Sequence, residues 1–391
     1  MDSKFRACAE IDLDALGHNI DAIRSRVGED TRIMAVIKTN AYGHGAVECA
    51  RYLSGIGVHD FAVATIEEGL ELRRSGIEGS ILVLGFIPEE MYPRMIEEDI
   101  TATIYSDSMA RHINAAARLA GKNAKAHIKL DTGMGRIGFR PCEENYEKIV
   151  IMYSMFKHID FEGIYTHFAC ADCADDEMTA AQFREFMDAI ETLEEHGAVF
   201  KVKHCANSAA VIRYPEMRLD MVRAGIILYG LYPSDEINEE LVDLKPVMSL
   251  KSRVIMMKNV EAGEPIGYGS TFVCSHASRI ATVSIGYGDG YPRALSNRGR
   301  VIIRGQSFPI VGRVCMDQLM VDTTSALPEA EIKPGDEVIL VGAQGSEKIT
   351  AEEASSYGDS FNYEFVCNIN RRIPRVYIEG GEAVSVTDYL D

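Results

Sequence analysis

The sequence lacks both a long apolar run and an excess of basic residues. Its apolar stretches are short, such as residues 81–84 and 226–228, whereas about 20 apolar residues are needed to span a bilayer as a helix. The N-terminal segment MDSKFRACAEIDLDAL has no continuous apolar core of the kind found in signal peptides. We therefore expect a cytoplasmic protein that makes no use of a membrane.

The charge balance is strongly acidic, with 40 Lys and Arg against 59 Asp and Glu, and 40 − 59 gives −19. Proteins that bind nucleic-acid backbones need clustered bases, so this balance argues against a nucleic-acid partner. It leaves room for a local positive pocket that binds a small anion.

A disulfide framework and a metal site are also missing from the pattern. The nine cysteines are an odd number and are scattered along the chain, which is not the pattern of a disulfide-rich fold. Cys170 and Cys173 form one C-x-x-C, but no second pair or suitably spaced histidines accompany it as a structural zinc site requires. We expect reduced thiols and no metal.

A chain of 391 residues with 47% hydrophobic and 25% charged residues has the composition of a globular protein of two domains. In residues 1–240, short β-branched runs alternate with helical patterns, which predicts a (β/α)8 barrel of the TIM type. The alternative, a doubly wound open sheet, is disfavoured because no G-x-G-x-x-G follows the first strand. The predicted strands are residues 32–38, 61–64, 81–84, 101–105, 125–131, 161–167, 201–204 and 219–224.

Residues 241–391 have a different pattern, with strand-like runs separated by turns rich in Gly and Pro. They predict a C-terminal, mainly β domain. Thr350 and Glu353 have the spacing of a capping box, which predicts one short helix there. The predicted strands are residues 251–257, 279–284, 300–304, 308–313 and 336–341.

Ionisable residues are concentrated where the barrel strands end, which is the edge that carries the active site in such barrels. Lys38 follows an apolar strand directly, so desolvation would lower its pKa and favour the neutral amine that Schiff-base chemistry needs. A lysine that extends its amine to solvent from a strand end explains the same pattern. The other ionisable residues at predicted strand ends are Lys129, Asp131, His167, His204 and Arg223.

Lys129 is predicted to point into the barrel, because strand alternation places Ala126 and Ile128 on the opposite, helix-facing side. Arg136 follows after a glycine-containing turn, and two buried cations would repel each other. Either Asp131 offsets them, or Lys129 is chemically converted to an anion.

A barrel hydrolase with a carbamylated lysine and a metal pair is an alternative, since His127, Lys129, His167 and His204 superficially fit its ligand set. The H-x-H motif expected on the first strand is absent, and Lys38 has no role in that scheme.

The segment after the seventh strand, HCANSAA, contains Asn207 and Ser208, which could begin a short helix and hold a phosphate.

Together these segments resemble the alanine racemases, which use pyridoxal 5′-phosphate (PLP). The resemblance covers nearly the whole chain in family order, which makes it far more specific than any single block. The matching blocks are AVIKTNAYGHG (35–45), KLDTGMGRIGF (129–139), HCANSAA (204–210), LDMVRAGIILYGL (219–231), GYGST (267–271), IGYGDGY (285–291), GRVCMDQ (312–318) and NYEFVCNINRRIPRVY (362–377).

The resemblance implies a homodimer that converts L-alanine to D-alanine with PLP, each active site being built from both subunits. Lys38 would bind PLP covalently and act as one acid/base, and the partner subunit's Tyr268 would act as the other. Arg223 would face the pyridine nitrogen, and Lys129 would be carbamylated. Further residues would bind cofactor (Tyr42, His167, Ser208, Gly225, Ile226 and Tyr363) or substrate (Arg136 and Met316).

Other activities remain open at this stage. A racemase of broader specificity for serine or basic amino acids is one, although Tyr363 favours alanine. Related PLP decarboxylases place an acidic residue at the pyridine nitrogen, so Arg223 argues against them, and non-catalytic PLP-binding barrels have no β domain. The family's usual role is to supply D-alanine as a peptidoglycan precursor.

Overall fold

The computed structural model describes residues 4–327 and 331–390, and the chain folds into two compact units. The barrel unit contains Gly17–Ala41 and Ala46–Lys245, and the β unit contains Met1–Leu16, Tyr42–Gly45 and Pro246–Asp391. The predicted boundary between residues 240 and 241 stays a prediction. The return of residues 42–45 to the β unit was not foreseen from the sequence.

Eight parallel strands form the sheet of the barrel unit, in the order β8-β7-β6-β5-β4-β3-β2-β9. The two end strands approach each other, because the Asp220 N–H donates to the Lys203 carbonyl (3.2 Å) and the Arg223 N–H to that of Ala206 (3.0 Å). The predicted barrel is therefore confirmed. The strands are β2 (Arg32–Val36), β3 (Asp60–Val63), β4 (Ser80–Val83), β5 (Thr101–Ile104), β6 (Ala124–Lys129), β7 (Ile159–Tyr165), β8 (Val202–His204) and β9 (Met221–Ala224).

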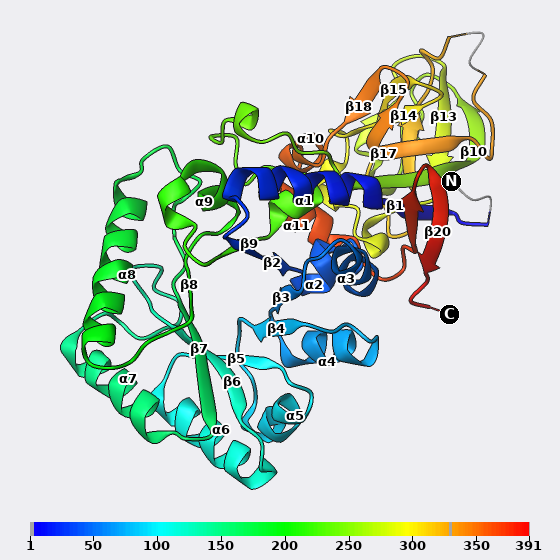
Figure 1. Ribbon diagram of the computed structural model, residues 1–391. Coiled ribbons are helices and arrows are strands. Elements are labelled where there is room, and N and C mark those ends of the chain that lie inside the picture. Colours follow the sequence, from blue (N-terminus) through cyan, green and yellow to red (C-terminus); the bar gives the residue numbers. More distant parts are fainter. Residues whose placement is uncertain (1–3, 328–330, 391) are drawn as a thin grey trace. The chain divides into compact units, whose positions relative to one another are not determined.

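Helices lie along the outer side of this sheet (Figure 1). Their amphipathic spacing explains this placement: Leu16, Ile20 and Ile23 of the first helix are fully buried on one stripe. The helices are α1 (Leu13–Val27), α3 (Ala46–Gly55), α4 (Ile66–Arg74), α5 (Tyr92–Glu97), α6 (Asp107–Ala120), α7 (Glu143–Met155), α8 (Glu177–Glu195) and α9 (Ser208–Arg213).

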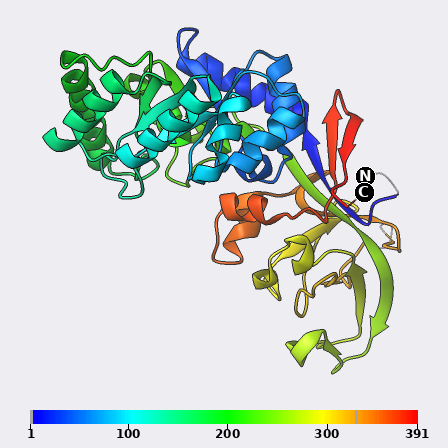
Figure 2. The same cartoon turned by 90° about the horizontal axis from the view of Figure 1, so that it is seen from below.

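A sheet of ten strands forms the core of the β unit, with the main path β15-β14-β17-β10-β1-β19-β20. Its longest strand, β10 (Met248–Val260), appears as the long yellow-green arrow in Figure 2. The N-terminal strand β1 (Ala7–Asp12) pairs antiparallel with β10 and parallel with β19 (Arg375–Glu379). The other strands of this sheet are β13 (Ser278–Val283), β14 (Arg300–Ile303), β15 (Gln306–Pro309), β16 (Leu319–Asp322), β17 (Glu337–Gln344), β18 (Glu347–Ile349) and β20 (Glu382–Thr387). A separate two-stranded sheet contains β11 (Pro265–Ile266) and β12 (Phe272–Val273).

Two short helices belong to the β unit, α10 (Ala351–Ser356) and α11 (Asn362–Asn368). Thr350 caps α10 as predicted, since its hydroxyl accepts from the Glu353 N–H (3.1 Å). The Glu353 carboxylate binds the Arg300 guanidinium (2.5 Å), and this pairing replaces the second half of the predicted capping box. Within the described residues, no helix is long and apolar enough to cross a membrane.

Candidate active site

The first barrel strand leads into a left-handed turn, and Lys38 stands at its start. β2 ends at Val36, so the predicted strand to residue 38 was too long. Thr39, Asn40 and Ala41 each have φ near 54°, a conformation that costs L-residues roughly 1–2 kcal/mol each. Four such residues in a row, counting Tyr42 with φ 51°, persist only where surrounding contacts stabilise them.

Side chains of neighbouring elements supply these contacts. A Glu68 carboxylate oxygen accepts from the Thr39 N–H (2.6 Å), and the Asn40 side-chain oxygen accepts from the Ala46 N–H (2.9 Å). The Ala41 N–H donates to the Ile37 carbonyl (2.8 Å). The backbone that carries Lys38 is therefore fixed by hydrogen bonds on both sides of the turn.

The continuation of the turn, Tyr42–Gly45, packs within the β unit. A Cβ on Gly43 would lie 2.1 Å from the Val366 carbonyl oxygen, so only glycine fits there. The Tyr42 and Tyr363 rings lie 6.1 Å apart, centroid to centroid. Arg375, fully buried, donates to the Gly43 carbonyl (2.9 Å).

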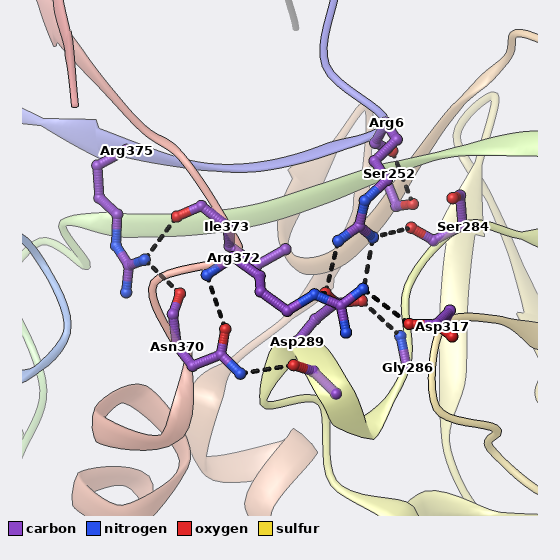
Figure 3. Close-up of polar contacts among 11 residues, drawn as sticks. Arg6, Ser252, Ser284, Gly286, Asp289, Asp317, Asn370, Arg372, Ile373 and Arg375 are labelled. Atoms are coloured by element: carbon purple, nitrogen blue, oxygen red, sulfur yellow. Dashed lines mark hydrogen bonds and ion pairs between the residues drawn. The ribbon is translucent and has the colours of Figure 1, made fainter. Parts of the chain in front are cut away.

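Arg375 also fixes the end of α11, the helix on which Tyr363 lies. It donates to the carbonyl of Ile369, the residue that ends α11. It also donates to the Asn370 and Ile373 carbonyls in the segment that follows (2.6 Å each), as Figure 3 shows. One guanidinium thus connects the Tyr42 segment to the Tyr363 helix. Sequence analysis missed this role of Arg375, although the residue lies in the block NYEFVCNINRRIPRVY.

Arg223, on β9, is the centre of a buried cluster in the barrel unit. Its Nη2 donates to the carbonyls of Thr166 (2.7 Å) and Cys205 (2.9 Å) and lies 3.2 Å from the His167 Nδ1. Its Nη1 lies 2.9 Å from the Nδ1 of His204. Among the described residues, its Nε–H has no hydrogen-bond partner, which leaves one donor for a ligand.

Lys129, at the end of β6, belongs to the same cluster. Its amine donates to the Leu130 carbonyl and lies 5.4 Å from the centroid of the Tyr165 ring. Burial, helped by the positive charge of Arg223, lowers its pKa to about 7. The positive charge of Arg136 makes a smaller contribution in the same direction, and Asp131 opposes the shift. Arg136 is exposed, so the expectation of two buried cations was wrong for Arg136.

A further group of predicted site residues contains Ser208, Gly225 and Ile226. The last two follow Arg223 closely in the sequence. The Ser208 hydroxyl accepts from the Gly225 N–H (2.9 Å). Asn207 caps α9, its side chain accepting from the Ala210 N–H (3.0 Å), and Ser208 is the first helical residue. The predicted short helix is therefore confirmed, and three residues expected at one phosphate lie together.

Tyr268 lies in the β unit and is strongly exposed, with 72% of its surface accessible. It lines a cavity of about 490 Å³ together with Ile255, Met256 and Met320. Met256 and Met316 are also more than half exposed. Tyr268 is thus displayed on an apolar surface of the β unit.

A polar network supports the loops that carry Tyr287 and Met316. Asp289, fully buried, accepts two hydrogen bonds from Arg6 (2.6 and 3.0 Å) and lies 3.4 Å from Arg372 (Figure 3). The Tyr287 N–H donates to the Cys315 carbonyl (2.9 Å). Sequence analysis did not single out Asp289, whose role depends on partners distant in the chain.

The predicted site residues divide between the two units, and in the β unit Tyr42 and Tyr363 lie together while Tyr268 lines a separate cavity. Their mutual placement across the units stays a prediction. His127 and His204, two members of the alternative metal set, bind each other (2.9 Å), and the described part of the chain contains no cluster with metal-binding geometry. The barrel group is Lys38, Lys129, Arg136, His167, Ser208, Arg223, Gly225 and Ile226, and the β group is Tyr42, Tyr268, Met316 and Tyr363.

A closed parallel barrel with a lysine after its first strand, joined to a mainly β unit, defines a class of two-domain barrel enzymes. Within that class, the chain belongs to the alanine racemase family, whose members are isomerases. Residues 11–233 match the family model "Alanine racemase, N-terminal domain", and residues 247–377 match "Alanine racemase, C-terminal domain".

Comparisons with individual relatives support the same family. The chain is 46% identical to an alanine racemase of Desulforamulus reducens over 95% of this chain and 98% of the relative. It is 45% identical to that of Clostridium tetani over 98% of both chains. A solved alanine racemase of Clostridium difficile 630 superimposes with a TM-score of 0.95 at 44% identity, covering 99% of this chain and all of that one.

A solved alanine racemase of Bacillus anthracis with bound L-Ala-P superimposes with a TM-score of 0.92 at 38% identity, covering 98% of each chain. The resemblance inferred from the sequence blocks is therefore confirmed for both units of the chain.

Proposed function

We propose that this chain racemises L-alanine to D-alanine with bound PLP and two opposed acid/base groups. Lys38 serves one face of the substrate Cα, and the partner subunit's Tyr268 serves the other. Family membership and the Bacillus anthracis relative with bound L-Ala-P support the substrate. The placement of Lys38 at the end of the first barrel strand is the observation that carries the proposal.

The residues present fit PLP. The unpartnered Nε–H of buried Arg223 suits the pyridine nitrogen, and His167 beside it suits the ring edge. The Ser208 hydroxyl and the Gly225 and Ile226 backbone form one group of phosphate ligands, and Tyr42 and Tyr363 form a second. When bound, PLP supplies the electron sink that stabilises negative charge at the substrate Cα.

Racemisation requires that a proton leave one face of Cα and return to the other. The Lys38 amine holds or releases a proton on its face, and the Tyr268 hydroxyl does so on the opposite face. Arginine stays protonated in proteins and has only donors, so Arg223 offers a hydrogen bond rather than a proton. This limits electron withdrawal at the ring nitrogen and disfavours transamination as a side reaction.

Lys129 fits carbamylation. A buried amine with a pKa of about 7 is largely neutral at physiological pH and can attack CO2, forming an N–C bond and releasing one proton to solvent. The resulting anion would form charge-assisted hydrogen bonds with Arg136, which would then orient the substrate together with the Met316 backbone. A carbamate would turn the repulsion between a protonated Lys129 and Arg136 into an attraction.

The exposed apolar surface around Tyr268 fits a second copy of the chain. Ile255 and Met256 line the same cavity as Tyr268 and are themselves exposed, and apolar side chains gathered on one surface favour a protein contact. A homodimer would bury them and deliver Tyr268 to the other subunit. The same family membership supports a cytoplasmic enzyme that supplies D-alanine for peptidoglycan.

The direct test is incubation of the protein with L-Ala, L-Ser and L-Lys separately, followed by an assay for each D-amino acid. Alanine should react fastest because the chain belongs to the alanine racemase family. Comparable rates with serine or lysine would instead support the racemase of broader specificity.

Tyr268→Phe tests the two-base assignment. Bound PLP and its absorption should persist, while racemisation of L-alanine should fall by about 10²–10⁴-fold, the usual contribution of a general acid or base. Tyr357→Phe, in the same unit and outside the proposed site, is the control and should keep wild-type turnover. Wild-type turnover in Tyr268→Phe would refute the role of Tyr268.

A further inference from the structure

Three buried side chains of the barrel unit form a linear hydrogen-bonded chain. Arg223 Nη1 lies 2.9 Å from the Nδ1 of His204, and the Nε2 of His204 lies 2.9 Å from the Nδ1 of His127. His204 and His127 are 0% and 4% exposed. The proposed two-base reaction gives His127 no role.

Only one order of donors and acceptors is possible along these hydrogen bonds. A guanidinium has donors and no acceptor, so the Nδ1 of His204 must accept. Burial, together with the charge of Arg223, lowers the pKa of His204 well below its ordinary value. The imidazole of His204 is therefore neutral, its single proton is on Nε2, and that N–H donates to His127.

His127 must then accept through its Nδ1. Burial lowers the pKa of His127 to about 3, so this ring is also neutral and its Nδ1 carries a lone pair. The resulting order of donors is Arg223 to His204 to His127. A reversed tautomer of His204 would place two donors against each other at Arg223.

Packing fixes the orientation of both rings. The Tyr165 ring stacks on His204 with centroids 4.7 Å apart and an interplanar angle of 16°, and the Tyr165 hydroxyl is held by Thr103 (2.9 Å). A Cβ on Gly163 would lie 2.7 Å from the Nδ1 and Cε1 atoms of His127. Glycine at position 163 is therefore needed for the His127 ring to occupy this place.

We propose that His127 is a positioning residue for Arg223. By accepting from the His204 Nε2–H, it stabilises the same tautomer of His204 that Arg223 requires and so strengthens the contact between His204 and Arg223, and Gly163 leaves space for its ring. The inference rests on the proposed function in one respect, namely that Arg223 contacts the PLP ring. His127 then acts on the reaction only through His204 and Arg223.

The test compares four variants of the full-length chain, with and without PLP. His127→Leu removes the acceptor, whereas His127→Asn keeps one, because the Asn side-chain oxygen can take the place of Nδ1. Gly163→Ala displaces the His127 ring. Gly55→Ala is the matched control, since no atom lies within 4 Å of a Cβ at that position.

Two measurements are made on each variant. Nitrogen-15 NMR of labelled histidines identifies the tautomer of His204. The ratio of pyruvate formed to D-alanine formed reports transamination relative to racemisation, which a purely structural loss of activity would leave unchanged. In the wild type, His204 should carry its proton on Nε2.

In His127→Leu, the buried Nε2–H of His204 loses its acceptor, so the Nδ1–H tautomer should become populated at the expense of the hydrogen bond from Arg223. The transamination ratio should then rise about tenfold, as expected for one lost hydrogen bond to a charged group. Gly163→Ala should shift both measurements in the same direction, and it decides the question if His127→Leu fails to fold. His127→Asn and Gly55→Ala should resemble the wild type.

An unchanged His204 tautomer and an unchanged ratio in both His127→Leu and Gly163→Ala would overturn the inference. Equal behaviour of His127→Asn and His127→Leu would overturn it as well, because the acceptor would then be irrelevant. A wild-type chain that forms no D-alanine would refute the proposed function instead, and the tautomer measured without PLP would still decide the role of His127.

Discussion

In the barrel unit, Arg223 and Lys129 are buried without forming an ion pair with any described residue, and carbonyls and neutral imidazoles surround them. In the β unit, the fully buried carboxylate of Asp289 pairs with both Arg6 and Arg372 (Figure 3). Both regions bury charge, which costs several kcal/mol per ion unless it is compensated. In the β unit the protein provides the compensating charge itself.

The difference separates a binding site from a supporting network. The barrel residues keep capacity for a ligand or a modification: Arg223 has a remaining Nε–H donor for the proposed cofactor, and the Lys129 amine can react with CO2 as proposed. The network around Asp289 is electrostatically complete, so its function is to hold its loops in place. Substitutions in the two regions should therefore affect different measurements.

Lys38→Ala should give the largest effect, and on chemistry rather than stability. Borohydride reduction followed by peptide mass spectrometry should find PLP attached to Lys38 in the wild type and to no residue in the variant. Racemisation should fall by at least about 10²–10⁴-fold, the contribution of a general base, with an unchanged melting temperature. Lys157→Ala, an exposed lysine of the same unit, is the control.

PLP attached at another lysine in the wild type would contradict the assignment of Lys38. Wild-type turnover of Lys38→Ala would contradict it independently of the labelling result.

Asp289→Asn should lower the stability of the protein rather than change its chemistry. Replacing the buried carboxylate removes the ion-pair partner of Arg6 and one of the two partners of Arg372. The free energy of unfolding should fall by about 1.5–3 kcal/mol, the range for hydrogen bonds to charged groups. Urea unfolding followed by circular dichroism measures this change. Asp317→Asn breaks an exposed pair with Arg372 (2.7 Å) and should cost about 1 kcal/mol or less.

A loss in Asp289→Asn no greater than in Asp317→Asn would remove the distinction between the two regions. So would a loss of PLP binding in Asp289→Asn with full stability retained.

Lys129 should give the smallest effect, visible as a pH dependence of stability. Its pKa is lowered from 10.5 to about 7 on folding, so between these values the unfolded chain binds more protons than the folded one. The free energy of unfolding should therefore rise with pH through this window, by at most about 1.4 kcal/mol per pH unit. Lys129→Met should remove this contribution.

The measurement is urea unfolding of wild type and Lys129→Met at pH 7.5 and 9 in CO2-free buffer. Parallel pH dependences in the two proteins would show that Lys129 is not a buried, uncompensated amine. Added bicarbonate should increase the mass of the native wild-type chain and leave that of Lys129→Met unchanged.

The sequence by itself determined the architecture and the family. Strand and helix periods depend on neighbouring residues, so all eight barrel strands were predicted within a few residues of their observed positions. Ordered family blocks then pointed to Lys38, Arg223 and Ser208. Contacts between α9 and β9 placed Ser208 beside Gly225, as those blocks implied.

Only the tertiary structure decided how the site residues are supported. The left-handed turn at Lys38 depends on Glu68, the Tyr42 segment on Arg375, and the orientation of Arg223 on His127. These partners are distant in the chain, and nothing in local spacing predicts which side chains meet. Short-range sequence patterns determine the helices and strands. Burial and hydrogen bonding between these elements determine the protonation and the orientation of the site side chains, because protonation and orientation depend on the environment that folding creates.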